Sequence, residues 1–413
     1  MQALLGLAVF IILAWLASGL RGHVHWRTVA AGLALQLGIA FLLLGVPFFA
    51  NGILALNAVV EAIETATGAG ASFVFGFLGG GEPPYAPTTE GALYLFAFRV
   101  LPQILVFSVL VALLWYWRVL PLVVRGVGWC LQRTMGVGGA VGTAGAASVF
   151  LGMAETPLVV RAYLSKLSTS ELFAVMTCGM STVAGSIMVL YASILGDRID
   201  GALGHVITAS VINVIGAVYL SKLIMPDTGP PTGNADTGGL TYSGNMDAIT
   251  RGTFDGLQLA VNVGAMVLVL VSLVALVNYL LGNFELAGAP LSLERLTGPL
   301  FSPVAWLVGI PWSEASTAGS LLASKLILNE VVAYLQMASL PADALSAQSR
   351  LVMTYALCGF TNFGSLGILI GGLTTLAPER RAEVLRIGPL TLLSGTLTAA
   401  VTGCIVGLVL SAL

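Results

Sequence analysis

The strongest constraint on this chain is a succession of apolar stretches long enough to cross a lipid bilayer. A helix needs about 20 apolar residues to span the hydrocarbon core. Eight stretches meet this requirement, near residues 2–20, 29–49, 92–117, 171–195, 203–224, 256–281, 349–376 and 388–411. Only 9% of the residues are charged, whereas soluble domains are roughly one quarter charged. The sequence therefore predicts an all-α polytopic membrane protein with eight transmembrane helices, in contact with the lipid bilayer.

The first apolar stretch, "MQALLGLAVFIILAWLASGL", has the length of a membrane span and lacks the basic n-region of a secretory signal peptide. We expect it to be the first transmembrane helix. The rest of the composition excludes several function classes. The net charge of −2 offers no basic surface for nucleic acid, and the three His and four Cys residues form neither CxxC nor HExxH. We therefore expect no structural metal site, disulfide framework or cofactor.

Two further hydrophobic regions, 138–167 and 313–337, do not form simple spans because Gly, Pro and Glu interrupt them. Glu155 lies in the first region and Glu330 in the second. A carboxylate at bilayer depth costs at least about 2.5–3.5 kcal/mol on insertion scales, so each glutamate needs a reason to be there. Broken segments of this kind are typical of re-entrant hairpins, whose bent backbone is covered by protein or lines a cavity.

The two broken regions resemble each other. "TAGAASVFLGMAET" begins at Thr143 and "TAGSLLASKLILNE" at Thr317, and a glutamate follows after 12 positions in the first and 13 in the second. Each region precedes a span that is interrupted by small and polar residues, "GMSTVAGS" at 179–186 and "GFTNFGS" at 359–365. These interruptions could be close-packing patches between helices, and the two glutamates could be protonated structural groups. Together, however, they indicate an inverted repeat of hairpin, broken helix and helix, the arrangement with which secondary transporters build a site at the membrane midplane.

The distribution of Lys and Arg predicts the orientation. With the N-terminus outside, 12 of the 17 basic residues lie inside, and the other five are Arg99, Arg198, Arg295, Lys325 and Arg350. The positive-inside rule then places both termini outside and the polar loop 225–245 in the cytoplasm. Residues 53–78 fit an amphipathic helix along the outer interface, although a short helix on the soluble side fits equally well.

Four motifs resemble the concentrative nucleoside transporter family, of the bacterial sodium-coupled type. They are "NEVVAYLQ" (329–336), "YALCGFTNFGSLGILIGG" (355–372), "GMAETPLVVRAYL" (152–164) and "STVAGS" (181–186). The resemblance implies a homotrimer in the bacterial inner membrane, with both termini periplasmic. Each subunit would have eight transmembrane helices, two re-entrant hairpins in an inverted repeat and an interfacial helix. It would be no enzyme but a symporter with an elevator-type alternating-access mechanism.

The same resemblance implies a division into four parts. Residues 1–135 would hold the scaffold and trimerisation helices with the interfacial helix, and residues 136–225 the first transport repeat. Residues 226–295 would form the cytoplasmic loop and a scaffold helix, and residues 296–413 the second transport repeat. The transport repeats would carry the nucleoside across the membrane.

Carried over residue by residue, the resemblance assigns substrate contacts to both repeats. The ribose end maps to Glu330, Asn362, Ser365 and Phe360, and the base end maps to Met153, Ala154, Glu155 and Ile187. A carboxylate and an amide suit vicinal hydroxyls, because a carboxylate accepts two hydrogen bonds and an amide both donates and accepts. Met-Ala stands where the family commonly has Gln-Thr, so we expect weak selection between bases and uptake of uridine, cytidine and adenosine.

The family's sodium site maps to the carbonyls of Ser148, Leu151 and Val183 and to the hydroxyl of Thr182. The hydroxyl favours Na⁺ as the coupling ion, with proton coupling as the alternative. A competing class is an intramembrane enzyme with Glu155 and Glu330 as acid and base, but the sequence places no His or Asp-rich loop beside them. A channel is the third possibility, which inverted hairpins with broken helices fit less well.

Overall fold

The computed structural model describes residues 2–19, 26–46, 62–85, 95–153, 155–196, 198–227, 229, 232–233, 241–286 and 289–412. Its N-terminal part contains α1 (Gln2–Ala17), α2 (Trp26–Gly45), a helix over 62–75 that continues as η1 (Gly76–Gly79), α4 (Phe96–Arg99), α5 (Leu101–Tyr116) and α6 (Val119–Met135). The first repeat contains α7 (Gly139–Ser148), α8 (Thr156–Val159), η2 (Arg161–Tyr163), α9 (Thr169–Ser181), α10 (Gly185–Leu195) and α11 (Ala202–Ile224). The remainder contains α12 (Asn245–Leu281), α13 (Leu293–Val308), α14 (Trp312–Ile327), α15 (Glu330–Ser339), α16 (Ala347–Leu357), α17 (Phe363–Leu376), η3 (Pro378–Arg380) and α18 (Arg381–Ala412). Among the described residues, the only strands are β1 (Glu285–Leu286) and β2 (Ala289–Pro290), which form one short antiparallel pair.

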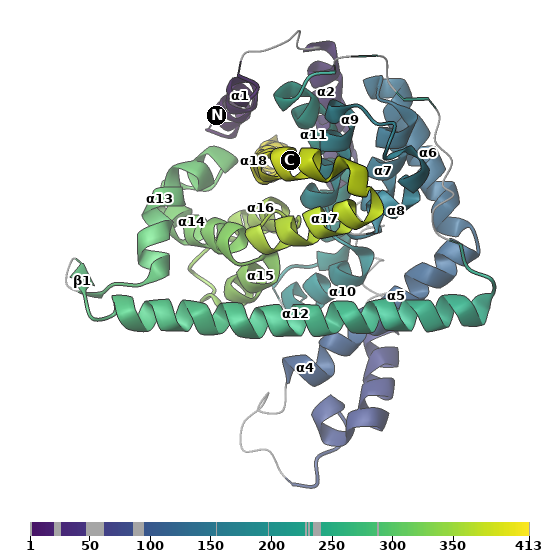
Figure 1. Cartoon of the computed structure of the whole chain (residues 1–413). Coiled ribbons are helices and arrows are strands. Elements are labelled where there is room, and N and C mark those ends of the chain that lie inside the picture. The colour runs from purple at the N-terminus through teal and green to yellow at the C-terminus, as the bar shows by residue number, and fades with distance from the viewer. Residues whose placement is uncertain are drawn as a thin grey trace.

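The predicted fold class, an all-α polytopic membrane protein, is confirmed (Figure 1). Six helical segments of the described chain are long and apolar enough to span a membrane, and α1 and α17 are shorter apolar helices. The predicted boundary at residue 256 is wrong for α12, which begins at Asn245. Hydropathy locates the apolar part of a helix, whereas a polar first turn continues the same hydrogen-bonded backbone beyond it.

The two repeats follow the predicted order of hairpin, broken helix and helix. In repeat 1, α7 and α8 form hairpin 1, α9 and α10 form the broken helix, and α11 follows. In repeat 2, α14 and α15 form hairpin 2, α16 and α17 form the broken helix, and α18 follows. We name the interruptions break 1 (182–184) and break 2 (358–362).

The two breaks touch. Gly359 in break 2 has φ +128°, and a Cβ there would lie 2.6 Å from the carbonyl oxygen of Ser181. Asn213 of α11 donates from its Nδ2 atom to the carbonyl of Ser181 at 2.8 Å and to that of Cys358 at 3.0 Å. One amide therefore satisfies a free carbonyl at the end of each first half-helix and holds the breaks together.

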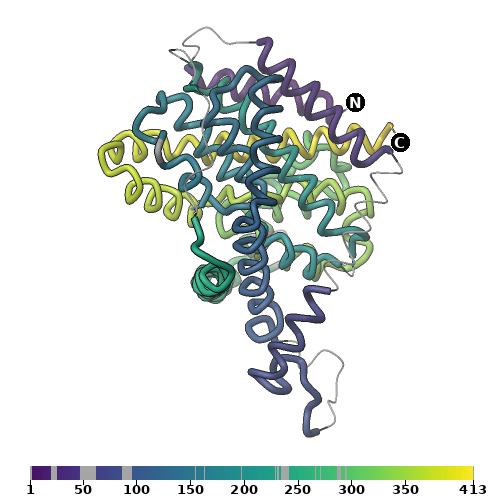
Figure 2. The backbone as a smooth tube through the Cα atoms, turned by 90° about the vertical axis from the view of Figure 1, so that its right-hand side faces the viewer, coloured from purple at the N-terminus to yellow at the C-terminus, as the bar shows by residue number. Residues whose placement is uncertain are grey.

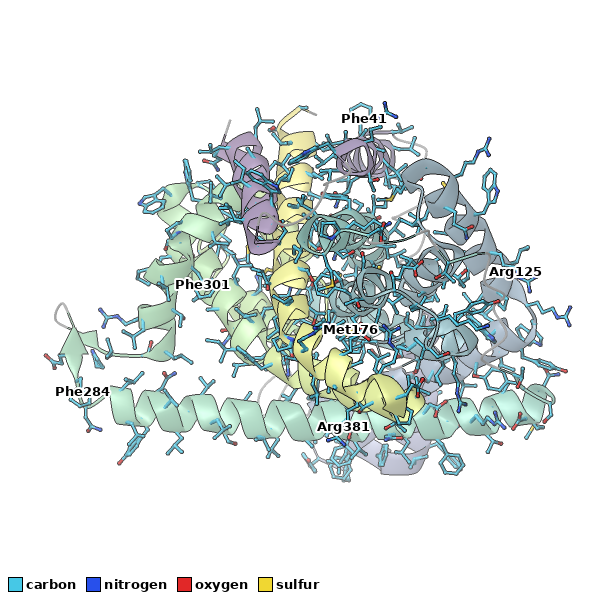
Figure 3. The ribbon with its side chains drawn as sticks, turned by 45° about the horizontal axis from the view of Figure 1, so that its top comes forward. Phe41, Arg125, Met176, Phe284, Phe301 and Arg381 are labelled. Carbon is cyan, nitrogen blue, oxygen red and sulfur yellow. The ribbon has the colours of Figure 1, made fainter. Side chains whose placement is uncertain are left out.

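The first-repeat broken helix and α12 occupy opposite environments. All residues in the most apolar window of α9–α10 are buried, against 6% of those in the corresponding window of α12. Figure 3 shows Met176 of α9 in the interior and Phe284, just beyond α12, at the periphery. Figure 2 looks along α12, which lies at one side of the bundle. The repeats therefore form the core, and α12 runs along their outside.

Helix α12 crosses α5 at close range. A Cβ at Gly252 would lie 2.8 Å from the Cα of Val109, and one at Gly256 would lie 2.8 Å from the Cα of Leu105. The two glycines are four residues apart and therefore share one face of the helix. Small residues on one face allow two membrane helices to approach closely without a side chain between them. This contact makes α5 and α12 one wall of the molecule.

The apolar stretches of the sequence do not predict two helices, α6 and α13. Helix α6 is amphipathic, with Leu120, Val124 and Leu131 buried and Trp129 exposed, and Figure 3 shows Arg125 pointing outward from it. Helix α13 contains two internal prolines and packs along α14. The predicted helix over 53–78 is described only from residue 62, and residues 53–61 lie outside the described chain.

Helices α1 and α2 pack against elements of both repeats. Helix α1 contacts α13 and α18, and α2 contacts α11 and α18. Gln36 of α2 is fully buried, donates to the carbonyl of Ile212 and to Oγ1 of Thr402 at 3.1 Å each, and accepts from the hydroxyl of Tyr219 at 2.8 Å. The four-part division, with both helices in the scaffold, stays a prediction.

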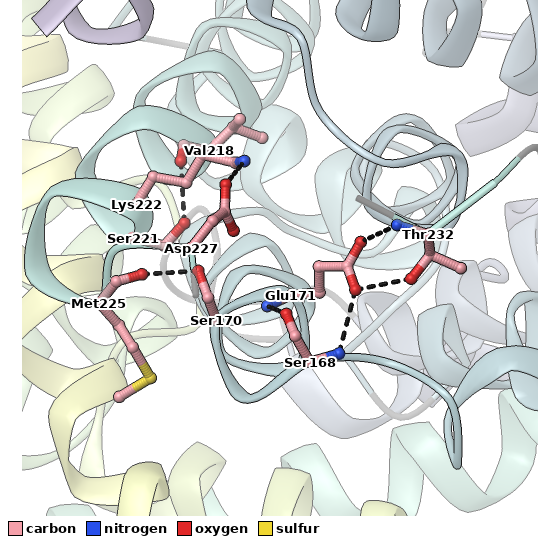
Figure 4. A network of polar contacts seen from close by, with 9 residues as sticks. All are labelled: Ser168, Ser170, Glu171, Val218, Ser221, Lys222, Met225, Asp227 and Thr232. Carbon is pink, nitrogen blue, oxygen red and sulfur yellow. Dashed lines mark hydrogen bonds and ion pairs between the residues drawn. The ribbon is translucent and has the colours of Figure 1, made fainter. Parts of the chain in front are cut away.

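A polar network fastens the loop after α11 to the start of α9 (Figure 4). Ser168 and Glu171 form a capping box at the first turn of α9. The Glu171 carboxylate also accepts from the backbone N–H of Thr232 at 2.7 Å and from its hydroxyl at 2.6 Å. Lys222, in the last turn of α11, forms an ion pair with Asp227. The network fixes the end of repeat 1 that lies away from break 1.

Candidate functional site

A cavity of about 420 Å³ lies where the hairpin tips meet the two breaks. Its wall is completed by residues of α5 and α12. It is lined by all seven described residues that the resemblance assigns to the substrate, which are Met153, Glu155, Ile187, Glu330, Phe360, Asn362 and Ser365. Ala154 lies outside the described residues. Residues from two hairpins and two broken helices, more than 200 positions apart in the sequence, thus converge on one space.

Glu330 is the first residue of α15 and is 3% exposed. Asn329 caps the helix, since its side-chain oxygen accepts from the N–H of Val332 at 2.9 Å. The Glu330 carboxylate accepts from the hydroxyl of Tyr191 at 2.8 Å and from Nδ2 of Asn362 at 2.9 Å. A helix N-terminus stabilises a negative charge. Glu330 is therefore held by donors from both repeats, with lone pairs left to accept from a ligand.

Asn362 uses both ends of its side chain. Its oxygen accepts from the N–H of Ser365 at 2.8 Å and so caps α17, while its nitrogen donates to Glu330. The cap fixes the side-chain rotamer, so the same residue orients the carboxylate and begins the second half-helix. Ser365 and Phe360 line the cavity beside them. The repeat 2 side of the cavity thus offers a carboxylate, an amide, a hydroxyl and one aromatic ring.

The repeat 1 side is less polar. Met153 is 7% exposed and Ile187 1% exposed, and a Cβ at Gly179 would lie 3.3 Å from the Cβ of Met153. Glu155 is half-buried and accepts from the N–H of Gly152 at 3.3 Å, within the same tip. This side therefore presents apolar surface with one carboxylate, which suits a flat ring with polar edges.

The four residues assigned to the cation lie on two segments in contact. Ser148 and Leu151 belong to the tip of hairpin 1, and Thr182 and Val183 belong to break 1. The N–H of Gly185 donates to the carbonyl of Phe150 at 2.8 Å, which joins the tip to the break. The hydroxyl of Thr182 donates to the carbonyl of Cys178 at 2.9 Å, so its lone pairs remain available to a cation. Carbonyl and hydroxyl oxygens of this kind are suitable ligands for a hard monovalent cation.

The sequence reasoning missed Tyr191 and three polar residues of α12. Tyr191 lies four residues after Ile187 and therefore on the same face of α10, which is the signal that could have found it. Asp255, Gln258 and Asn262 of α12 line the cavity from the opposite wall. Their spacing of three and four residues places them on one helix face, but the sequence does not show which way that face points.

The described residues contain no group of three or more His, Cys, Asp or Glu side chains placed to hold a metal ion.

Three family models match the chain in succession. The N-terminal model of the Na⁺-dependent nucleoside transporters matches residues 5–78, a gate model described as "nucleoside recognition" matches 97–198, and the C-terminal model of the same transporters matches 205–407. Together they cover both repeats and the helices before them.

Curated relatives and solved structures agree with these models. The chain is 34% identical to "Nucleoside permease NupC" of Helicobacter pylori over 98% of its own length and 97% of the relative's. It is 32% identical to "Solute carrier family 28 member 3" of Homo sapiens over 98% of its own length and 59% of the relative's. It superposes on CNTnw in an inward-facing substrate-bound state with a TM-score of 0.90 and 35% identity, covering 100% of this chain and 98% of that one.

These relatives are transporters and not enzymes, which agrees with the predicted absence of catalytic residues. The matches run from one end of the chain to the other, and the cavity lies where the two repeats of the fold meet. By sequence, fold and site position, the chain belongs to the concentrative nucleoside transporter family.

Proposed function

We propose that the protein imports nucleosides together with Na⁺, by moving its two repeats against a static wall formed by α5 and α12. The observation that carries the proposal is the buried Glu330, held by Tyr191 and Asn362 at the edge of the shared cavity. A buried carboxylate that keeps free lone pairs is costly unless a ligand uses them. The vicinal hydroxyls of a ribose supply two donors in the geometry that a carboxylate accepts.

Polarity supports the assignment of ribose to repeat 2 and base to repeat 1 that the family resemblance implies. Ribose carries most of the hydrogen-bonding groups of a nucleoside in a small volume, and the carboxylate, amide and hydroxyl gather at Glu330, Asn362 and Ser365. The base offers a wide apolar face, and Met153 and Ile187 provide an apolar surface for it. Methionine contacts aromatic faces favourably, by about 0.3–1.5 kcal/mol. Glu155 is then the polar anchor for the base edge.

The coupling ion is proposed to bind between the hairpin 1 tip and break 1. Support comes from the hydroxyl of Thr182 and the nearby backbone carbonyls, since the end of α9 carries the negative end of its helix dipole. Bound there, Na⁺ would join hairpin 1 to α9 and so set the position of Met153 and Glu155. Nucleoside and ion would thus favour the same closed arrangement, which is the condition for coupling.

The elevator-type movement is supported by the contrast between core and wall. Structures similar to this chain include CNTnw variants in an outward-facing state, with a TM-score of 0.90, and in an intermediate state, with a TM-score of 0.91. The repeats share the interlocked breaks and would move as one unit, while α12 keeps its glycine contact with α5. All seven described side chains that are assigned to the substrate belong to the repeats and would then travel with the cargo.

We place the protein in the bacterial inner membrane as a homotrimer with periplasmic termini. Helix α12 exposes a long apolar face that includes Leu257, Val261 and Leu268. Exposed apolar faces of this size mark contacts with lipid or with a second subunit. A wall that must stay still while the repeats move gains rigidity when three copies join through it.

Uptake into proteoliposomes tests the central proposal. Purified protein is reconstituted, and labelled uridine uptake is measured with an inward sodium gradient, with an inward proton gradient and with neither. We expect accumulation with the sodium gradient alone. Accumulation that follows the proton gradient and ignores sodium would establish the proton-coupled alternative instead.

Cysteine labelling tests the orientation. Gly233 lies in the loop after α11 and Pro83 in the segment after η1. A single cysteine at position 233 should react with a membrane-impermeant maleimide only from the cytoplasmic side, and one at position 83 only from the periplasmic side. Reaction of both from the same side would contradict the inverted topology.

A further inference from the structure

Lys325 is a buried cation that the substrate and ion assignments do not use. It lies on α14, near the tip of hairpin 2, and is 4% exposed. Its Nζ atom donates to the carbonyl of Ala356 at 3.0 Å. Ala356 belongs to the last turn of α16, where backbone carbonyls lack helical partners and the helix dipole is negative. The ammonium therefore ties the hairpin 2 tip to the end of the first half-helix of repeat 2.

The inverted repeat gives this contact a counterpart. Lys325 follows Thr317 by the same eight positions by which Leu151 follows Thr143 in the matching Thr-Ala-Gly motif. Leu151 is one of the proposed sodium ligands, at the tip of hairpin 1. The ammonium of repeat 2 thus lies between a hairpin tip and a helix end, as the proposed Na⁺ does in repeat 1.

The helix end supports the same correspondence. Thr182 is the C-cap of α9 and Cys358 the C-cap of α16. The hydroxyl oxygen available to a cation in repeat 1 is therefore replaced by a sulfur in repeat 2, and that Sγ faces the carbonyl of Val206 at 3.8 Å. Thiols are poor ligands for hard cations such as Na⁺. Repeat 2 therefore has a sulfur where repeat 1 has the hydroxyl oxygen, and it carries a covalently attached positive charge beside that helix end.

We propose that Lys325 is a resident cation that holds, in repeat 2, the place that the mobile coupling ion holds in repeat 1. Its role is to close hairpin 2 on α16 and thereby position Glu330, five residues further along the chain. Because this charge never leaves, repeat 2 is always in its ion-bound arrangement, and only repeat 1 responds to sodium. The protein then needs one Na⁺ per nucleoside. This inference rests on the proposed sodium coupling.

Two substitutions separate the charge from the space that it fills. Lys325→Met keeps most of the side-chain stem and removes the charge, so no ion can enter. Lys325→Ser removes both and leaves a hydroxyl beside the carbonyl of Ala356, where a second Na⁺ could bind. Lys222→Met is the matched control, since Lys222 is also a largely buried lysine of a repeat but pairs with Asp227 away from the cavity.

The experiment measures uridine binding by calorimetry in detergent over a sodium series at constant ionic strength. Lys325→Met removes a charge-assisted hydrogen bond. It should therefore bind uridine at least about tenfold more weakly than wild type at every sodium concentration. Lys325→Ser should be equally weak in low sodium and return to within about threefold of wild type in high sodium, with a sodium Hill coefficient rising from about one to about two. Lys222→Met should match wild type.

Two results would overturn the proposal. One is binding by Lys325→Met within about threefold of wild type, which would show that the charge positions nothing. The other is an equal, sodium-independent loss in both Lys325 variants, as expected of a purely structural lysine. If Lys325→Met does not give a folded protein, the decision rests on Lys325→Ser, whose melting temperature should rise more steeply with sodium than that of wild type. If the uridine affinity of the wild type does not depend on sodium, the ion coupling itself is refuted. The difference in uridine affinity between Lys325→Met and Lys222→Met would still decide the role of the charge.

Discussion

The two hairpins share a sequence pattern and differ in how their glutamates are held. Glu330 accepts hydrogen bonds from Tyr191 of repeat 1 and Asn362 of repeat 2. Glu155 accepts only a bond from Gly152, within its own tip, among the hydrogen bonds that the structure gives it. The second arm also differs, because α15 has 10 residues and α8 has four. Hairpin 2 therefore presents a carboxylate oriented by both repeats, whereas the carboxylate of hairpin 1 is held from within its own tip.

The difference shows how the two halves of an inverted repeat can take different roles in binding. A ribose is common to all nucleosides, so the side of the cavity whose carboxylate is already oriented by hydrogen bonds suits it. Bases vary in size and in edge chemistry, so the apolar side with fewer fixed bonds suits them. The proposed mobile ion lies at hairpin 1 and the fixed lysine at hairpin 2, which follows the same division. The predictions below change one side at a time.

The largest effect is expected for Glu330→Gln. The amide keeps the shape of the side chain but replaces one acceptor oxygen with a donor, so it loses charge-assisted bonds to the ribose. We expect about 100-fold weaker uridine uptake, with the proposed trimer intact, since each such bond contributes about 1.5–3 kcal/mol. Glu155→Gln is the matched comparison and should cost less. Equal losses of uptake in both variants, measured in the same assay, would show that the two glutamates contribute equally and would contradict the difference between the hairpins.

The second effect concerns the ion. Thr182→Val preserves shape and burial but removes the hydroxyl oxygen from break 1. The sodium concentration for half-maximal uptake should rise about tenfold, while uptake at saturating sodium changes less. Thr177→Val is the control, because its hydroxyl bonds Ser394 away from the break. A sodium curve for Thr182→Val that overlies that of Thr177→Val would remove Thr182 from the ion site.

A smaller effect is expected for Tyr191→Phe. Loss of its hydroxyl removes one of the two donors that orient Glu330, so the KM for uridine should rise about fivefold. Tyr334→Phe removes a buried hydroxyl that bonds the carbonyl of Thr354, and it should leave the KM unchanged. Kinetics of both variants at saturating sodium test whether Tyr191 acts through Glu330 or only through packing.

The smallest differences are expected between bases. Uridine, cytidine and adenosine should compete with labelled uridine within about threefold of one another, because Met153 and Ile187 offer surface rather than fixed hydrogen bonds. Nucleosides without the 2′- or 3′-hydroxyl should compete at least about tenfold less well, as one charge-assisted bond at Glu330 is lost. Strong preference for one base class, with indifference to the hydroxyls, would reverse the assignment of the two ends.

The sequence by itself determined the class of protein, the repeat and seven of the residues that meet at the cavity. Apolar length shows spans because the bilayer has a fixed thickness, and an isolated glutamate in such a span indicates function because burying it is costly. The same logic missed α6 and α13, since an amphipathic helix and a helix with two prolines do not have the hydropathy of a span.

Only the tertiary structure decided which hydrogen-bond donor pairs with which acceptor. Asn213 joins the two breaks, Tyr191 crosses from repeat 1 to Glu330, and Lys325 ends on the carbonyl of Ala356. Each is a buried polar side chain, for which the sequence shows that a hydrogen-bond partner is needed but does not name it. The partner is set by how two distant helices pack, because a buried polar group must find its hydrogen bond wherever the fold brings a complementary atom within reach.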